Sequence, residues 1–242
     1  MPDSRSDVPI VIVANPHSGN GRAPAILTEA VDTLALFGHV VTICEDTLEQ
    51  MQHELARHVP GSSAVVAIGG DGLIHRVTQH LAGTDTPLGI IPAGSGNDIA
   101  RALRLRRNPS QALKEICNAL TWPEFTQEID LLKVRGADFD AWVVAVVSLG
   151  LDAKVNYRAV NKTAGWGRWR YVTALIGELA EMQADTYTIS LDGGAPHEMT
   201  GIVAAVANLG YFGSGMQIAP MAHAKGQVPC SGVTAFSSRL GF

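Results

Sequence analysis

The first half of the chain alternates short apolar runs with segments in which apolar residues recur every three or four positions. The runs are rich in β-branched residues and predict strands at 9–14, 39–44, 64–68 and 88–91. The periodic segments predict helices that begin near Pro24, Asp46, Leu73, Asp98 and Ser110. Asp46 with Glu49 three residues later resembles a capping box for the second of these helices. This alternation predicts an α/β domain, in which helices cover both faces of a parallel sheet.

After the last of these helices the pattern changes to strand-like runs. They cover residues 128–134, 139–147, 186–191 and 202–208. Turn signals at Arg135-Gly136 and Asp192-Gly193-Gly194 predict antiparallel hairpins between neighbouring runs. A helical insert is expected at 153–182. We therefore expect an α/β domain over residues 1–125, followed by a β-rich, antiparallel domain over residues 126–242.

Three of the predicted strands end at a glycine-rich turn that precedes a helix. The turns are Asn15-Pro-His-Ser-Gly19, Gly69-Gly-Asp-Gly72 and Gly94-Ser-Gly-Asn-Asp98. In a parallel sheet, the loops that follow the strands lie along one edge, where ligands bind. Glycine leaves backbone N–H groups accessible to a phosphate, and a helix N-terminus favours negative charge. Together the three turns predict a site for a nucleotide or a polyphosphate.

The two acidic residues in these turns also have structural interpretations. A carboxylate at Asp71 is unfavourable beside bound phosphates unless a cation or a hydrogen-bond network offsets its charge, so we expect Mg²⁺ or such a network nearby. An Asp-Gly pair is also common in plain tight turns. Asp98 has an alternative role as the first-turn carboxylate of the next helix, which contributes about 1 kcal/mol and requires no ligand.

Composition narrows the class of protein. The 242 residues are 46% hydrophobic and 17% charged, as in a soluble globular protein, and a formal net charge of -5 gives no basic field for a nucleic-acid partner. The cysteines Cys44, Cys117 and Cys230 form no C-x-x-C pair, which argues against a disulfide framework or a zinc site and favours the cytoplasm. No apolar run approaches the roughly 18 residues of a spanning helix, so we expect any membrane contact to be peripheral.

Several side chains outside the turns are candidates for further contacts. His75 follows the second turn closely enough to contact a phosphate. The arginines between residues 101 and 107 form either a solvated helix end or a surface for anionic headgroups or nucleotide. Trp166 and Trp169 lie among arginines and glycines, which favours either an interfacial patch or packing between domains.

The ordered set of motifs resembles the diacylglycerol kinase catalytic family, which includes soluble bacterial lipid kinases and sphingosine and ceramide kinases. The similar segments occur in family order at 15–19, 69–72, 92–101, 129–131, 148–153 and 208–220. They extend over nearly the whole chain to Pro220, whereas a lone Gly-Gly-Asp-Gly also occurs in NAD kinases. The resemblance implies an α/β nucleotide-binding domain followed by a β-rich domain, with ATP between them.

The resemblance also implies roles for individual residues. Asp71 and Asp98 would be the catalytic acids, in a network that positions Mg²⁺-ATP and the hydroxyl of a lipid. ATP would contact Asn15, Pro16, His17, Ser18, Gly19, Gly69, Gly70, Asp71, Gly72, Leu73, Gly94, Ser95, Gly96 and Asn97. The implied reaction transfers the γ-phosphate of ATP to diacylglycerol or a similar lipid, in the cytoplasm or at the inner membrane surface. The oligomeric state is left open.

The chain departs from the family pattern in two places. Leu73 and Arg76 stand where the family commonly has a threonine and an acidic residue, so contacts there are expected to differ. After Pro220 the family continues with acids that hold a structural Mg²⁺ and with the proposed general base, and residues 221–242 lack these acids. We therefore expect a second domain that is incomplete at its C-terminus, with no carboxylate to assign as the general base, so that an active and an inactive chain both stay open. An NAD-kinase-like phosphotransferase and a nucleotide-binding protein without catalysis are the alternatives.

Overall fold

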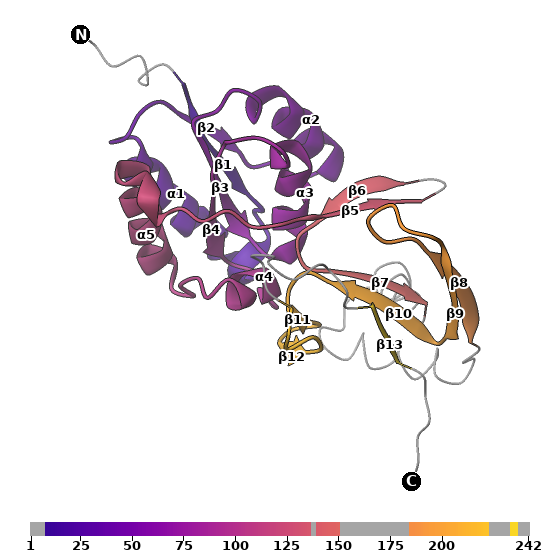
Figure 1. The fold of residues 1–242 in the computed structure, drawn as a ribbon. Coiled ribbons are helices and arrows are strands. Elements are labelled where there is room, and N and C mark those ends of the chain that lie inside the picture. The colour runs from indigo at the N-terminus through magenta and orange to yellow at the C-terminus, as the bar shows by residue number, and fades with distance from the viewer. Residues whose placement is uncertain (1–7, 137–138, 151–183, 223–232, 237–242) are drawn as a thin grey trace. The chain divides into compact units, whose positions relative to one another are not determined.

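The structure is a computed structural model that describes residues 8–136, 139–150, 184–222 and 233–236. The chain divides into two compact units, each built from two stretches of sequence (Figure 1). The first unit comprises Met1–Ala145 and Asn208–Gln227, and the second comprises Val146–Ala207 and Val228–Phe242. The domain boundary drawn near residue 126 from the sequence pattern stays a prediction.

A parallel sheet of four strands forms the centre of the first unit. Its strand order is β2-β1-β3-β4, and all three pairings are parallel. The strands are β1 (Ile10–Ala14), β2 (Val40–Ile43), β3 (Ala64–Gly69) and β4 (Leu88–Pro92). The central strands β1 and β3 are buried along their whole length, which explains why their sequences are continuous apolar runs. The predicted parallel α/β sheet is confirmed.

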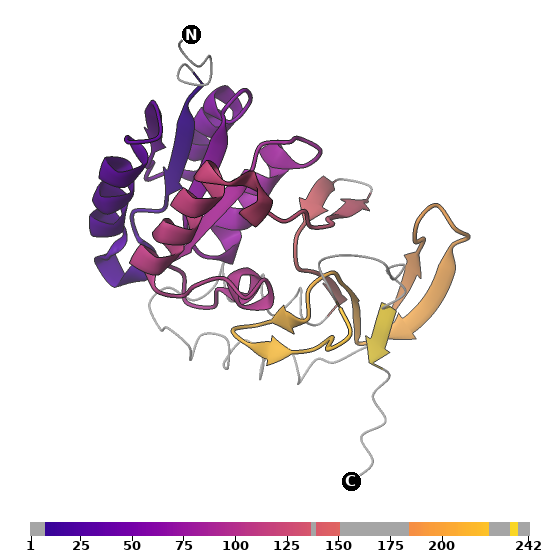
Figure 2. The ribbon, with the colours of Figure 1, turned by 60° about the vertical axis from the view of Figure 1, so that its left-hand side comes forward.

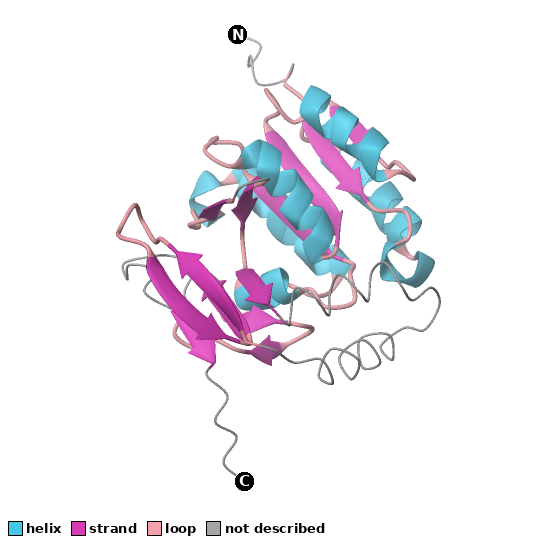
Figure 3. Ribbon diagram, turned by 90° about the vertical axis from the view of Figure 1, so that its right-hand side faces the viewer, coloured by secondary structure: helices cyan, strands magenta, loops and turns pink. Residues whose placement is uncertain are grey.

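Helices cover both faces of this sheet (Figure 3). They are α1 (Ala23–Leu34), α2 (Leu48–His58), α3 (Asp71–Leu81), α4 (Asp98–Ala102) and α5 (Pro109–Thr121). Ile10 and Ile12 pack with α1 and α5, whereas Val11 and Val13 pack with α2 and α3 on the opposite face. The two faces of one strand therefore anchor two helical layers. Within the described ranges, no helix has the length and apolar character needed to cross a membrane.

Two helix starts differ from the sequence prediction. The N-cap of α2 is Thr47, whose Oγ1 accepts a hydrogen bond from the N–H of Gln50 (3.3 Å). The capping box predicted at Asp46 and Glu49 is therefore wrong by one residue, because the Thr47 and Gln50 pair beside it provides the cap and satisfies the N–H of Gln50 instead. Helix α3 begins at Asp71 rather than at Leu73, so the glycine turn runs directly into the helix.

The remaining described strands form small antiparallel sheets (Figure 2). In the first unit these are β5 (Leu132–Arg135) with β6 (Asp140–Val143), and β11 (Tyr211–Phe212) with β12 (Met216–Gln217). In the second unit, β8 (Asp185–Ile189) pairs with β9 (His197–Gly201). A separate sheet of three strands has the order β13-β10-β7 and consists of β7 (Val146–Gly150), β10 (Val203–Ala207) and β13 (Val233–Phe236). Short 3-10 turns occur as η2 (Ser18–Gly21) and η3 (Pro123–Phe125).

The predicted hairpin at Arg135-Gly136 is confirmed between β5 and β6. The turn predicted at 192–194 also joins two antiparallel strands, but its second strand is β9 and not the predicted run 202–208, which forms β10 in another sheet. The sequence pattern missed β9 because His197–Gly201 is mostly polar and has no apolar run. The run at 139–147 is in fact two strands, β6 and β7, which belong to different sheets. Asp192 and Gly193 both have positive φ, and the N–H of Gly194 donates to the carbonyl oxygen of Leu191, as a type I′ turn requires. The predicted helical insert at 153–182 lies outside the described residues.

Candidate functional site

The three glycine turns meet at the carboxyl edge of the parallel sheet. They follow β1, β3 and β4, which are neighbours in the sheet. A Cβ atom on Gly94 would lie only 2.4 Å from Cα of Gly70, so the second and third turns pack backbone against backbone. A Cβ atom on Gly19 would lie 3.7 Å from the carbonyl oxygen of Ala93, which places the first turn beside the third. The structure therefore brings together the three segments singled out in the sequence.

In the first turn, the side chain of Asn15 shapes the backbone. Its Oδ1 accepts a hydrogen bond from the N–H of His17 (2.9 Å), and its carbonyl oxygen accepts one from the N–H of Ser18 (3.0 Å). Gly19 then adopts a φ of +68°, which a larger side chain would strain. Nε2 of His17 lies 3.9 Å from Oδ1 of Asp46, and because both side chains are exposed this pair contributes little.

In the second turn, the start of α3 is free of side-chain caps. Gly70 is the N-cap and makes no side-chain hydrogen bond, and a Cβ atom on Gly72 would meet no atom within 4 Å. Leu73 is 6% exposed and packs into the core, and its N–H donates to the carbonyl oxygen of Gly70 (3.0 Å). The first N–H groups of α3 are thus open to an anion, whereas Leu73 is directed inward.

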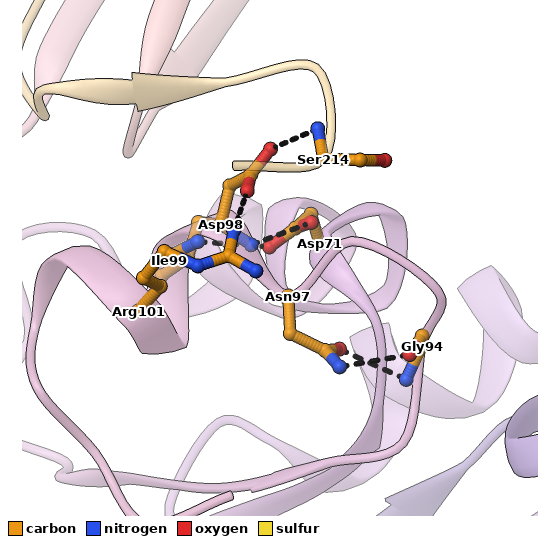
Figure 4. Close-up of polar contacts among 7 residues, drawn as sticks. All are labelled: Asp71, Gly94, Asn97, Asp98, Ile99, Arg101 and Ser214. Atoms are coloured by element: carbon orange, nitrogen blue, oxygen red, sulfur yellow. Dashed lines mark hydrogen bonds and ion pairs between the residues drawn. The ribbon is translucent and has the colours of Figure 1, made fainter. Parts of the chain in front are cut away.

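In the third turn, Asn97 closes the loop with its own amide. Its Oδ1 accepts a hydrogen bond from the N–H of Gly94 (2.9 Å), and its Nδ2 donates to the carbonyl oxygen of Gly94 (2.8 Å) (Figure 4). Asn97 has a φ of 54°, a left-handed conformation that asparagine tolerates. The N–H groups of Ser95 and Gly96 donate to no acceptor in the described part of the chain. The loop therefore presents two consecutive backbone donors that are not used by the protein.

Asp71 connects the second turn to the third. Its Oδ2 accepts a hydrogen bond from the N–H of Asp98 and its Oδ1 accepts one from the N–H of Ile99, each at 3.0 Å (Figure 4). Asn97, the N-cap of α4, makes no side-chain cap bond, so the carboxylate of Asp71 caps this helix from α3. These donors and the helix terminus offset the negative charge of Asp71 next to the glycine turns.

Asp98 connects α4 to the segment that returns to the first unit. The side chain is nearly buried, since the residue is 8% exposed. Oδ1 forms an ion pair with the guanidinium of Arg101, and Oδ2 accepts a hydrogen bond from the N–H of Ser214 at 2.7 Å (Figure 4). The guanidinium of Arg101 also lies 5.9 Å from the ring centroid of Tyr211. Sequence reasoning missed Ser214, because 116 positions separate it from Asp98 and no local pattern joins them.

The described residues include no group of three or more His, Cys, Asp or Glu side chains that is placed to hold a metal ion.

His75 lies in α3, one turn after Asp71. Desolvation lowers the pKa of His75, and the charge of Arg76 lowers it further. The imidazole is therefore mostly neutral at pH 7.

Comparison with known proteins assigns the chain that carries this site to a family. Residues 9–134 match the family described as the diacylglycerol kinase catalytic domain. The chain belongs to this family. Residues 145–228 match a second family, described as the YegS C-terminal NAD kinase beta sandwich-like domain. The two matches confirm the resemblance drawn from the motifs.

Individual relatives agree with this membership of the diacylglycerol kinase catalytic domain family. The chain is 35% identical over 217 residues to a diacylglycerol kinase of Mycobacterium tuberculosis (strain ATCC 25618 / H37Rv), which covers 88% of this chain and 69% of the relative. It is 25% identical over 207 residues to a putative lipid kinase of Staphylococcus carnosus (strain TM300), covering 82% and 62%. A solved putative diacylglycerol kinase from Bacillus anthracis str. Sterne shares the fold with a TM-score of 0.66 at 22% identity, over 89% of this chain and 71% of that one.

Proposed function

We propose that this chain transfers the γ-phosphate of ATP to the hydroxyl of a lipid such as diacylglycerol. The observation that carries this proposal is the meeting of three glycine turns at one edge of the sheet in a member of a lipid kinase family. Phosphoryl transfer relies on positioning and on neutralising charge, and it requires little covalent chemistry from the protein. Backbone donors held rigidly at one edge suit that requirement.

The phosphates of ATP fit backbone donors that have no acceptor within the described residues. These are the N–H groups of Ser95 and Gly96 and those at the start of α3, next to the open space at Gly72. Because these donors are backbone groups that the fold already holds in place, they bind phosphate without the entropy cost of ordering long cationic side chains. The hydroxyls of Ser18 and Ser95 and the backbone at Gly19 complete the proposed contacts.

Mg²⁺ would supply charge neutralisation between the phosphates when bound. Asp71 fits this ion, because each of its oxygens accepts one hydrogen bond and carboxylate oxygens hold a second lone pair. Mg²⁺ commonly takes only one or two carboxylates and completes its coordination with phosphates and water. Asp98 has a different proposed role. It is nearly buried and is bound to Arg101 and to the backbone of Ser214, so we propose that it positions the turn that carries Ser214.

A phosphate-transfer assay on the full chain tests the proposal. The chain is incubated with radiolabelled ATP and Mg²⁺ and with diacylglycerol, sphingoid base or NAD as acceptor. We expect labelled lipid phosphate, and addition of EDTA is expected to abolish it. Labelled product from NAD alone would favour the NAD-kinase-like alternative instead. ATP binding without any labelled product would contradict the kinase proposal and favour a nucleotide-binding protein without catalysis.

The lipid acceptor implies peripheral contact with a membrane surface, for which we propose the arginines after α4. Arg106 is paired with Glu115 at 2.7 Å, whereas Arg107 is exposed and has no ion-pair partner in the described ranges. Arg107→Glu is expected to weaken binding to vesicles that contain phosphatidylglycerol by roughly thirtyfold, since each basic residue near an anionic surface contributes about 1 kcal/mol and reversing the charge doubles this to about 2 kcal/mol. Co-sedimentation at low and high salt measures the effect.

The matched control is Arg57→Glu, which makes the same charge change on the exposed side of α2. It is expected to leave vesicle binding unchanged. Equal binding by both variants and the wild type would contradict a role for Arg107 at the membrane.

A further inference from the structure

The turn between β11 and β12 holds a serine in a conformation that favours glycine. Gly213, Ser214 and Gly215 have consecutive φ values of +64°, +70° and +107°. Glycine adopts such values without strain, whereas a serine with a Cβ atom does so at a cost. Glycine would therefore be the more stable residue at position 214. The stability of the fold does not explain why a serine side chain is present there.

The backbone of Ser214 is fixed from two sides. Its N–H donates to Oδ2 of the nearly buried Asp98 (2.7 Å), and a Cβ atom on the next residue, Gly215, would lie 3.1 Å from a guanidinium nitrogen of Arg101. Asp98 and Arg101 are themselves joined by an ion pair (Figure 4). The turn is therefore held against α4, and the position of the Ser214 side chain is set by this pair.

The hydroxyl of Ser214 is directed at the third glycine turn. A Cβ atom on Gly96 would lie 3.4 Å from Oγ of Ser214 and 3.2 Å from Oδ2 of Asp71, so the Ser214 hydroxyl lies directly beside this glycine. Ser214 is exposed, and its hydroxyl donates to no acceptor in the described residues. An unused hydroxyl donor therefore lies beside the unused N–H group of Gly96.

We propose that Ser214 is a further binding residue, whose hydroxyl donates a hydrogen bond to a phosphate oxygen of the polyphosphate held by the Gly94–Asn97 turn. This inference rests on the proposed function, because it assumes that ATP is the ligand there. A hydrogen bond from a neutral donor to a charged phosphate accounts for about a tenfold difference in affinity.

Ser214→Gly separates binding from folding, because the two effects have opposite signs. We expect ATP and inorganic tripolyphosphate to bind about tenfold more weakly by titration calorimetry, while the urea midpoint of unfolding stays equal to or rises above that of the wild type. Ser214→Ala removes the hydroxyl and keeps the strained Cβ atom, so it is expected to lose the same affinity without the gain in stability. Ser214→Asn tolerates the left-handed conformation and keeps a donor, and it is expected to restore part of the affinity.

The matched control is Asp192→Gly, which introduces glycine at another left-handed position (φ of 49°), in the β8–β9 hairpin of the second unit. Aspartate tolerates this conformation, so the substitution is expected to leave both the unfolding midpoint and the ATP affinity close to those of the wild type. Wild-type affinity in Ser214→Gly and Ser214→Ala, with a wild type that binds ATP, would overturn the inference about Ser214 alone. A wild type that binds neither ATP nor tripolyphosphate would overturn the proposed function and, with it, this inference.

Discussion

Asp98→Ala is expected to lower the free energy of unfolding by about 2–3 kcal/mol and to weaken ATP binding roughly tenfold or more. The carboxylate is nearly buried, and its removal leaves the guanidinium of Arg101, 24% exposed, without its ion-pair partner. It also leaves the N–H of Ser214 without an acceptor. Affinity falls because the turn that carries Ser214 is no longer held against α4. Urea unfolding and titration calorimetry measure the two effects.

Two further variants identify the cause of the Asp98 effect. Asp32→Ala removes an exposed carboxylate on α1 and is expected to change stability by less than about 0.5 kcal/mol. Arg101→Met added to Asp98→Ala is expected to recover part of the lost stability, because removing both partners leaves no unpaired charge in a mostly buried position. If Asp98→Ala were as stable as Asp32→Ala, the ion pair would not hold the turn.

The sheet and the meeting of the turns could be predicted because each rests on a local pattern. Apolar runs such as 9–14 and 64–68 are long, continuous and β-branched, which is what a central parallel strand requires when both of its faces are buried. Parallel topology then places every strand-to-helix turn at one edge. That rule places the turns of Gly70 and Gly94 at the same edge of the sheet. It does not predict that their backbones are in direct contact.

The links that complete the site depend on contacts with no local signal. The pairing of Asp98 with Ser214 joins residues 116 positions apart, and only the return of Asn208–Gln227 to the first unit brings them together. For Asp71 the sequence left two alternatives, a cation or a hydrogen-bond network, because it does not show that the N–H groups of Asp98 and Ile99 face the carboxylate. Its charge is therefore offset by a helix terminus, a tertiary effect that residue spacing does not encode.

Gly94→Ala is expected to have the largest effect on phosphate transfer. The new Cβ atom would lie 2.4 Å from Cα of Gly70 and 2.9 Å from Oδ1 of Asn97, so the second and third turns must move apart. Overpacking of this kind costs about 1–3 kcal/mol of unfolding free energy. A displacement near 1 Å at a reacting centre lowers rates on the order of a hundredfold, and we expect that loss in the lipid phosphorylation assay.

Gly72→Ala is the matched comparison, because it makes the same substitution in the neighbouring turn with opposite steric consequences. A Cβ atom on Gly72 meets no atom within 4 Å, and the residue lies in the first turn of α3. The alanine is therefore expected to stabilise the chain by about 0.5–1 kcal/mol through the entropy of the unfolded state. Equal unfolding free energies for Gly94→Ala and Gly72→Ala would contradict the backbone contact between Gly94 and Gly70. A Gly94→Ala variant that is destabilised yet transfers phosphate at the wild-type rate would instead place the reacting phosphate away from this pair of turns.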